Sequence, residues 1–210
     1  MFYETINNLP DYFYSRIEEI SLPANKILIH QEGELRYLYM VKKGSVKVYH
    51  TNEKGQEFLF GLFGQGEFFG ELEYFTNTNY FSSVETISEC TVLRFTKELF
   101  KEILETSPAL FALFCSSISF RLLKISQRST EASYYPLEVL LAKFLDNEIK
   151  DNKTSEVNVI KENLAGYFGT NVRSINRILK KFSDNKIITI NGSRIEIINP
   201  VLLQKIFYKY

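Results

Sequence analysis

The chain has 210 residues, of which 45% are hydrophobic and 24% charged, so it can form one large domain or two small domains that each bury a core. Basic and acidic residues number 25 each, which excludes a uniformly basic or acidic protein, and neither an apolar run nor an N-terminal leader pattern predicts a membrane span or export. The two cysteines fit no metal-ligand spacing and indicate buried thiols in a reducing compartment, so we expect a cytoplasmic protein.

Charge is divided unevenly along the chain. Residues 1–135 contain 13 Lys and Arg against 17 Asp and Glu, whereas residues 136–210 contain 12 against 8. Such a division is typical of a protein whose C-terminal part meets a polyanion while its N-terminal part does not.

Residues 20–100 alternate short β-type runs with glycine-containing turns. The runs lie at 26–30, 38–41, 45–50, 58–63, 82–88 and 90–95. Short, evenly spaced strands with turn signals between them predict an antiparallel sandwich or barrel. Because the chain has no Trp but 18 Phe and 13 Tyr, we expect an interior rich in these two aromatic residues.

Residues 66–83, GEFFGELEYFTNTNYFSS, have the frame of an anion-binding loop but lack its charge. Two glycines bracket two aromatic residues, Glu71 follows, and two serines come after Phe81. A phosphate group is normally held by charge-assisted hydrogen bonds from a cation. This stretch contains no Lys or Arg, which leaves the purpose of its frame to be explained.

A helical pattern runs from about residue 96 to residue 133, with Ser107 as a plausible N-cap and Pro108 in the first turn of a long helix. Apolar residues then recur with heptad spacing, and Cys115 accompanies them. The pattern predicts either a helix packed on the core of its own chain or a seam between two helices. The polar remainder of the helix favours the seam, so we predict a homodimer held by Phe111, Phe114, Ile118, Leu122 and Ile125.

The sequence Tyr134-Tyr135-Pro136 breaks the helical pattern and is expected to mark a domain boundary. An amphipathic helix at 137–149 and a polar loop follow. Residues 161–199 then contain two short helices joined by a turn in which Gly169 can adopt the left-handed conformation. Thr170 or Asn171 can cap the second helix. The buried stripe of the second helix is predicted to be Val172, Ile175, Ile178, Leu179 and Phe182.

The opposite face of this second helix carries side chains suited to the major groove of DNA. Arg can pair with both acceptors of guanine and Asn with adenine, while Lys can reach phosphates. An ordinary helical domain with a solvated basic face is the alternative. The spacing and the turn favour a helix-turn-helix. The predicted DNA-binding residues are Thr170, Asn171, Arg173, Ser174, Asn176, Arg177, Lys180, Lys181 and Arg194.

Two β-type runs flank Asn191-Gly192, which is a strong hairpin signal. Such a hairpin would form a wing beside the helix-turn-helix and lay Arg194 along the DNA backbone. Residues 170–194 contain six basic residues and one acidic residue, which agrees with a surface that binds DNA.

As a whole, the chain resembles the bacterial cyclic-AMP receptor protein/fumarate–nitrate regulator (Crp/Fnr) family of transcription factors. Residues 66–71 are similar to the family's phosphate-cassette opening, the heptad helix to its dimerisation helix, and 161–199 to its winged helix-turn-helix. The resemblance implies an α+β protein with a cyclic-nucleotide-binding-type β-roll, a double-stranded jelly roll, at 1–105. A dimerisation helix at 106–133 and a winged helix-turn-helix domain at 136–210 would follow.

The family's effector residues carry over only in part. In members that bind cyclic AMP, the cassette Glu contacts the ribose, and an Arg-Ser or Arg-Thr pair holds the cyclic phosphate. Glu71 and Ser82 are present, whereas Phe81 occupies the arginine position, and Arg36 and Arg94 lie outside the cassette. A phosphate would therefore lack its cation, which argues against cyclic AMP. The resemblance places the effector pocket at Gly70, Glu71, Leu72, Phe81, Ser82 and Ser83.

Other sensing chemistries of the family fit the sequence no better. Two isolated cysteines cannot supply the four ligands of an iron–sulfur cluster, and His30 and His50 lie in contexts unlike that of a haem ligand. We therefore expect no cofactor and no metal site. We also expect no catalytic residues, since Glu71 with Ser82 and Ser83 lacks a base. An uncharged or carboxylate-bearing organic effector, or no effector, remains open.

The recognition helix also departs from the family, because Arg173 stands where many members have a Glu that contacts cytosine. An Arg donates where a Glu accepts, so the half-site should differ at that base pair. The favoured interpretation is that the protein is a homodimeric regulator that binds two-fold symmetric double-stranded DNA. Two alternatives are a DNA-binding protein whose β-roll serves only dimerisation and RNA polymerase contact, and a regulatory module that acts on a protein partner.

Overall fold

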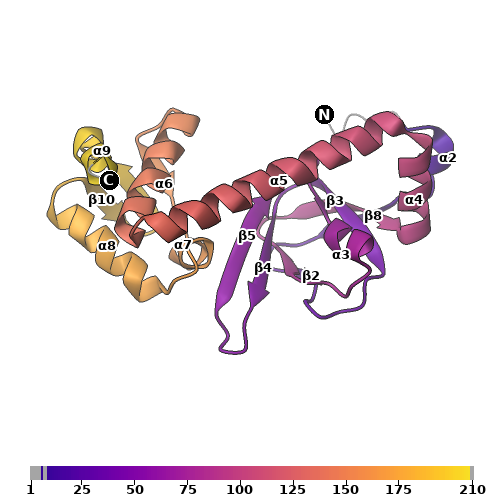
Figure 1. Cartoon of the computed structure of the whole chain (residues 1–210), viewed down its shortest axis with the longest axis horizontal. Helices are drawn as coiled ribbons and strands as arrows, with labels where there is room; N and C mark the ends of the chain where they lie inside the picture. Colours follow the sequence, from indigo (N-terminus) through magenta and orange to yellow (C-terminus); the bar gives the residue numbers. More distant parts are fainter. Residues whose placement is uncertain (1–5, 7–8, 209–210) are drawn as a thin grey trace. The chain divides into compact units, whose positions relative to one another are not determined.

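The computed structural model describes residue 6 and residues 9–208 (Figure 1). Contacts divide the chain into two compact units, Met1–Leu122 and Leu123–Tyr210. The division falls within helix α5 (Pro108–Tyr134). The sequence Tyr134-Tyr135-Pro136 ends this helix as expected, but the compact units divide earlier, so α5 is shared between them.

The N-terminal unit is a roll of two four-stranded antiparallel sheets, with strand orders β1-β8-β3-β6 and β2-β7-β4-β5. This confirms the predicted roll. The sequence pattern did not predict β1 or the short β6. Strand β6 lies inside the segment 66–83 that the sequence indicated to be a loop. The strands are β1 Glu18–Leu22, β2 Ile27–Ile29, β3 Tyr37–Lys43, β4 Val46–Thr51, β5 Glu57–Phe63, β6 Phe68–Phe69, β7 Ser83–Thr86 and β8 Cys90–Thr96.

Strand β3 belongs to two hydrophobic cores because its side chains alternate between the faces of its sheet. Tyr39 and Val41 face the roll interior with residues of both sheets. Leu38 and Met40 lie on the other face, which is covered by α2 (Asp11–Tyr14), α4 (Lys97–Thr106) and the first half of α5. Both cores contain Phe or Tyr side chains, as their abundance predicted.

Helix α3 (Glu71–Thr76) occupies the middle of the stretch that the sequence indicated to be a loop. Gly70 precedes it with φ +91°, a left-handed conformation that favours glycine, and Asn77 ends it with φ +55°. Gly70 thereby turns the chain from β6 into α3 and places Glu71 in the first turn of the helix.

Ser107 Oγ accepts a hydrogen bond from the Leu110 amide at 3.3 Å, which confirms the predicted cap of α5. Phe114 is 2% exposed, and its ring lies 5.7 Å from that of Phe68 and 5.3 Å from that of Phe100. The prediction that Phe114 lies in a seam between two chains is therefore wrong, because its own roll already buries it. Heptad spacing alone does not distinguish an apolar residue that packs on its own roll from one that packs against the helix of a second chain.

Up to residue 208, the C-terminal unit contains the last turns of α5, four further helices and a three-stranded sheet of order β10-β11-β9. The expected helix at 137–149, the helix-turn-helix and the hairpin are all present, and β9 and α9 are additions. The elements are α6 Leu137–Asn152, β9 Glu156–Asn158, α7 Lys161–Tyr167, α8 Val172–Asp184, β10 Ile188–Asn191, β11 Arg194–Ile197 and α9 Pro200–Phe207 (Figure 1).

Candidate DNA-binding surface and effector site

Helices α7 and α8 form a helix-turn-helix with a tightly bonded turn. Gly169 adopts φ +60°, and the Thr170 amide donates to the Ala165 carbonyl oxygen at 2.8 Å. Asn171, rather than Thr170, caps α8, since its Oδ1 accepts from the Ser174 amide at 2.8 Å. The core of the unit holds α8 in place through Ile175, Ile178, Leu179 and Phe182, all of them buried. Its opposite face is thus presented by a firmly anchored helix.

That outer face consists of exposed polar and cationic side chains: Arg173, Asn176, Arg177 and Lys180. Across residue 6 and residues 9–208, none of its three cations takes part in an ion pair. Thr170 and Ser174 lie half-buried at the start of α8. The face can therefore offer guanidinium and amide donors to base edges without first breaking an ion pair.

Lys181 differs from its neighbour Lys180. Its Nζ lies 2.9 Å and 2.7 Å from the two carboxylate oxygens of Glu138, at the start of α6. Both side chains retain solvent contact, with 58% and 31% exposure. A phosphate would have to compete with Glu138 for Lys181, so Lys180 is the better candidate for a contact with the DNA backbone.

The wing forms as the sequence predicted. Asn191 pairs with Arg194 across the β10–β11 hairpin, and Gly192 adopts φ +62° in its turn. Arg194 is exposed, and its Nε lies 3.4 Å from a Glu156 carboxylate oxygen on β9. This exposed ion pair is weak enough for Arg194 to exchange Glu156 for a phosphate.

Glu71, the residue at the ribose-contacting position, is paired with a cation that the sequence analysis missed. Arg121 of α5 places Nη1 2.5 Å from Glu71 Oε1, and its guanidinium lies 4.8 Å from the centre of the Phe63 ring. Burial raises the pKa of Glu71, and Arg121 opposes that rise. The expectation of a site without a nearby cation is therefore wrong, because α5 brings Arg121 from fifty residues away.

Phe81 does not take up an anion-binding role. Its ring is 52% exposed and stacks on His50, with ring centres 4.8 Å apart, beside Phe60. Its carbonyl oxygen lies 2.8 Å from His50 Nδ1, and its amide donates to Glu73 Oε1 at 2.8 Å. Phe81, at the position where cyclic-AMP-binding members have arginine, thus packs in an aromatic cluster with side chains of β4 and β5.

The other residues expected at the effector pocket have different surroundings. Ser82 is half-buried, whereas Ser83 is buried and its Oγ accepts a hydrogen bond from the backbone amide of Gln31 at 3.1 Å. Gly70 is buried, but Leu72 is 55% exposed on α3. No single cluster of polar groups aimed at a phosphate results from these positions.

A stripe of side chains along α5 is largely exposed, and only Ile118 within it packs in part against the core of the roll. Phe111, Leu122 and Ile125 are 46%, 63% and 41% exposed, Cys115 is exposed, and Ile118 is half-buried against its own core. These residues are spaced four, three, four and three apart. We call this set, with Cys115 in place of Phe114, the α5 stripe. It has the spacing of a two-stranded helical seam.

By length and composition α5 could cross a membrane. Its inner face nevertheless belongs to the folded roll, since Leu110 and Phe114 are buried there and Arg121 pairs with Glu71.

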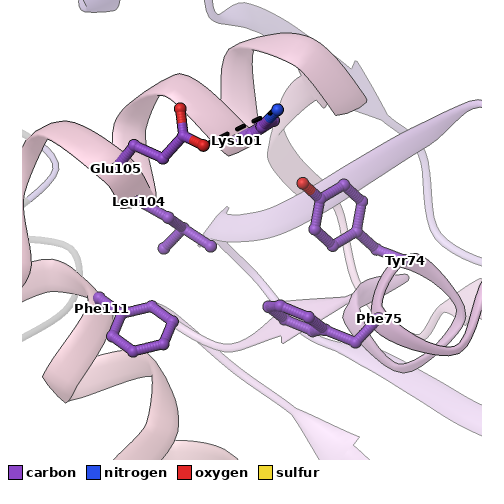
Figure 2. A pocket seen from close by; sticks show the side chains of 6 residues that line it. All are labelled: Tyr74, Phe75, Lys101, Leu104, Glu105 and Phe111. Atoms are coloured by element: carbon purple, nitrogen blue, oxygen red, sulfur yellow. Dashed lines mark ion pairs between the residues drawn. The ribbon is translucent and has the colours of Figure 1, made fainter.

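An open groove of about 390 Å³ lies between α3, α4 and the start of α5. Figure 2 shows the rings of Tyr74, Phe75 and Phe111 around it, together with Leu104 and the Lys101–Glu105 ion pair. Its lining is mainly apolar. Phe111 belongs both to this groove and to the α5 stripe.

Within the part of the chain that the structure describes, no group of three or more His, Cys, Asp or Glu side chains could hold a metal ion.

Two family models match the chain in the order of its two units. Residues 19–107 match the cyclic nucleotide-binding domain, and residues 139–206 match the Crp-like helix-turn-helix domain. Together they cover most of the sequence and include both the Glu71 site and the recognition helix. The chain belongs to the Crp/Fnr family of transcription regulators. It is accordingly a DNA-binding transcription regulator of the Crp/Fnr type.

Similar curated proteins match over nearly the whole chain. The cAMP-activated global transcriptional regulator CRP of Haemophilus influenzae is 23% identical over 192 residues, which cover 88% of this chain and 86% of that protein. The Cyclic AMP receptor protein of Thermus thermophilus is 20% identical over 205 residues, which cover 98% and 93% of the two chains.

Solved structures share the fold. The c-di-GMP-responsive global regulator CLP of Xanthomonas campestris superposes with a TM-score of 0.81 at 20% identity, covering 89% of this chain and 96% of that one. A putative Crp/Fnr-family regulator from Eubacterium rectale has a TM-score of 0.79 at 15% identity and covers 99% of both chains. The relatives include proteins named for two different nucleotides, so membership of the family does not identify an effector.

Proposed function

We propose that this regulator is a homodimer that binds a two-fold symmetric DNA site through α8. The observation that carries the proposal is the outer face of α8, where Arg173, Asn176, Arg177 and Lys180 are exposed on a capped and anchored helix. Arg173 and Arg177 are one turn apart and would approach base edges, while Lys180 would meet the backbone. Arg194 of the wing would add a second backbone contact.

The dimer would form through the α5 stripe. Its exposed apolar side chains have the spacing of a parallel two-helix seam, and a second copy would remove them from water. Dimeric helix-turn-helix proteins bind half-sites one DNA turn, about 34 Å, apart, so we expect half-site centres roughly 10 base pairs apart.

We propose further that cyclic AMP is not the effector, although the curated relatives are named for it. Phe81 removes the expected cation, and Arg121 is already paired with Glu71. A cyclic phosphate would have to displace that buried pair to gain a cation. The effector would then be an uncharged or carboxylate-bearing organic molecule, or the roll would serve only dimerisation and RNA polymerase contact.

The remaining parts of the proposal follow the family's known biology. The protein would act in the bacterial cytoplasm, contact RNA polymerase when bound at promoters, and have no catalytic activity. The match to the Crp-like helix-turn-helix domain argues against the alternative in which the C-terminal unit contacts a protein partner.

Selection of bound DNA from a random pool tests the proposal. Purified protein is incubated with the pool, with and without cell extract, and the enriched sequences are determined. We expect palindromes with the stated spacing, and extract should change the yield if it contains an effector. Enrichment of single half-sites would contradict the dimer, and no enrichment in either condition would contradict sequence-specific binding through α8.

A further inference from the structure

Within the C-terminal unit, cationic side chains connect the last turns of α5 to α6 and α7. Arg128 lies over the ring of Tyr167 on α7, with Cζ 4.7 Å from the ring centre. Lys143 of α6 places Nζ 3.1 Å from a Glu131 carboxylate oxygen and 4.0 Å from the centre of the Tyr135 ring. Residues 128 and 131 lie on one face of the helix at i and i+3, and Tyr135 directly follows α5, with its backbone amide donating to the Glu131 carbonyl oxygen at 2.9 Å.

Tyr167 connects this attachment to the turn of the helix-turn-helix. Its ring packs edge-on against Phe168 at 5.0 Å and lies 5.6 Å from Phe144 of α6. Phe168 is the C-cap of α7 and is followed directly by Gly169, the left-handed residue of the turn. A displacement of Tyr167 would thus be passed to the segment that sets the direction of α8.

The surroundings of Arg128 strengthen its contact with Tyr167. The side chain is half-buried, and burial lowers the pKa of its guanidinium. A cation that has lost part of its water is attracted more strongly to an aromatic face than an exposed one.

We propose that Arg128 is a positioning residue for DNA binding: by stacking on Tyr167, it holds α7 and α8 in a fixed orientation relative to the last turns of α5. A symmetric site requires both recognition helices to reach their half-sites together. A loosened Arg128–Tyr167 contact would leave each α8 able to bind one half-site but would weaken simultaneous binding of both. This consequence for DNA rests on the proposed dimer, whereas the attachment itself does not.

Two pairs of variants separate the ring contact from other effects. Tyr167→Leu removes the aromatic face but keeps an apolar side chain beside Phe144 and Phe168, while Tyr167→Phe keeps the face and removes only the hydroxyl. Arg128→Gln removes the charge and the cation–π contact, while Arg128→Lys keeps the charge but lacks the flat guanidinium.

The first measurement is amide hydrogen exchange in the full-length protein without DNA. Exchange in peptides covering residues 126–135 should become roughly three- to tenfold faster in Tyr167→Leu and Arg128→Gln. Tyr167→Phe should accelerate exchange less than Tyr167→Leu does, because it keeps the ring face and loses only the hydrogen bond between the hydroxyl and Arg128. Peptides covering residues 108–116 should not change in any variant. Unchanged exchange at 126–135 in Tyr167→Leu and Arg128→Gln would overturn the proposal, as would equal acceleration in Tyr167→Phe.

The second measurement compares affinity for a full palindrome and for the same duplex with one half-site scrambled. Tyr167→Leu and Arg128→Gln should weaken full-site binding roughly three- to tenfold and leave half-site binding unchanged, with Arg128→Lys in between. An equal loss on both duplexes would assign the residues to the stability of the helix-turn-helix and overturn the positioning role. A wild type that binds both duplexes equally would contradict the proposed dimeric binding, and hydrogen exchange would still decide the attachment.

Discussion

Arg121 of α5 donates to the buried carboxylate of Glu71 on α3, with Nη1 2.5 Å from Oε1, and no cation lies within the α3 segment itself. The pair links the long helix to the position at which the family contacts its nucleotide. A ligand that forms an ion pair or hydrogen bond with Arg121 or Glu71, in place of their contact with each other, must therefore disturb the contact between α5 and the roll.

Replacing Arg121 with Ala should destabilise the protein by about 3 kcal/mol at pH 7, because it leaves the Glu71 carboxylate buried without its cation. Burial already raises the pKa of Glu71, and loss of Arg121 should raise it further. A native state that binds a proton more tightly than the unfolded state gains stability as the pH falls. The deficit should therefore shrink between pH 7 and pH 5 in chemical denaturation, and a pH-independent deficit would contradict this origin. Glu71→Gln is the control, which should lack the pH-dependent part.

Replacing Leu122 with Asp should convert the dimer to monomer, because each copy would bury a charge in the α5 stripe at a cost on the order of several kcal/mol. Leu123→Asp is the matched control, since Leu123 is also exposed but points about a quarter-turn away. Sedimentation should show monomer only for Leu122→Asp. In contrast, Phe114→Ala should cost about 3–5 kcal/mol of stability while the protein remains dimeric.

Mild oxidation should link two copies through Cys115, because the proposed dimer would place the two Cys115 residues of the α5 stripe opposite each other across its two-fold axis. Non-reducing electrophoresis after treatment with copper phenanthroline should show a covalent dimer. Cys115→Ser should abolish it. The same change at Cys90, which is buried, should not. Absence of the link at dimer concentrations would require a different seam.

Cyclic AMP at millimolar concentration should change neither the melting temperature nor the affinity for DNA. A ligand present at 100 times its dissociation constant should add about 2.7 kcal/mol to the stability of the native state, which thermal melting detects readily. Phe81→Arg, which restores a cation at that position, serves as the comparison. A clear upward shift for the unaltered protein would show that Phe81 is no obstacle to the nucleotide.

Arg177→Ala should cost about 1–3 kcal/mol on the best site and relax the preference at one base pair in each half-site. Lys180→Ala should weaken all sequences alike and lower the salt dependence by about one counterion per subunit. Lys181→Ala should lower it less, because Glu138 already pairs with that lysine. Titrations at several salt concentrations distinguish the three variants, and equal slopes for Lys180→Ala and Lys181→Ala would contradict the role of Glu138.

The sequence by itself determined the features that depend on neighbouring residues. Gly169 indicated the turn, Thr170 or Asn171 indicated the cap of α8, Asn191-Gly192 indicated the wing, and the short β runs predicted an antiparallel roll. Each feature depends on backbone conformation or side-chain period within a few residues, so no distant contact is needed to predict it.

Tertiary structure decided which distant groups meet. Heptad spacing on α5 could not reveal that Phe114 packs into its own roll while Cys115 faces outward. The core of the roll and the proposed second copy of α5 would both present apolar side chains to this helix, so both favour the same spacing. The partners Arg121 and Glu71, and Lys181 and Glu138, lie far apart along the chain and belong to different helices. Only the folded chain brings such charges together. Because Glu71 is buried, its attraction to Arg121 is screened less by water, and loss of either partner would leave an uncompensated charge.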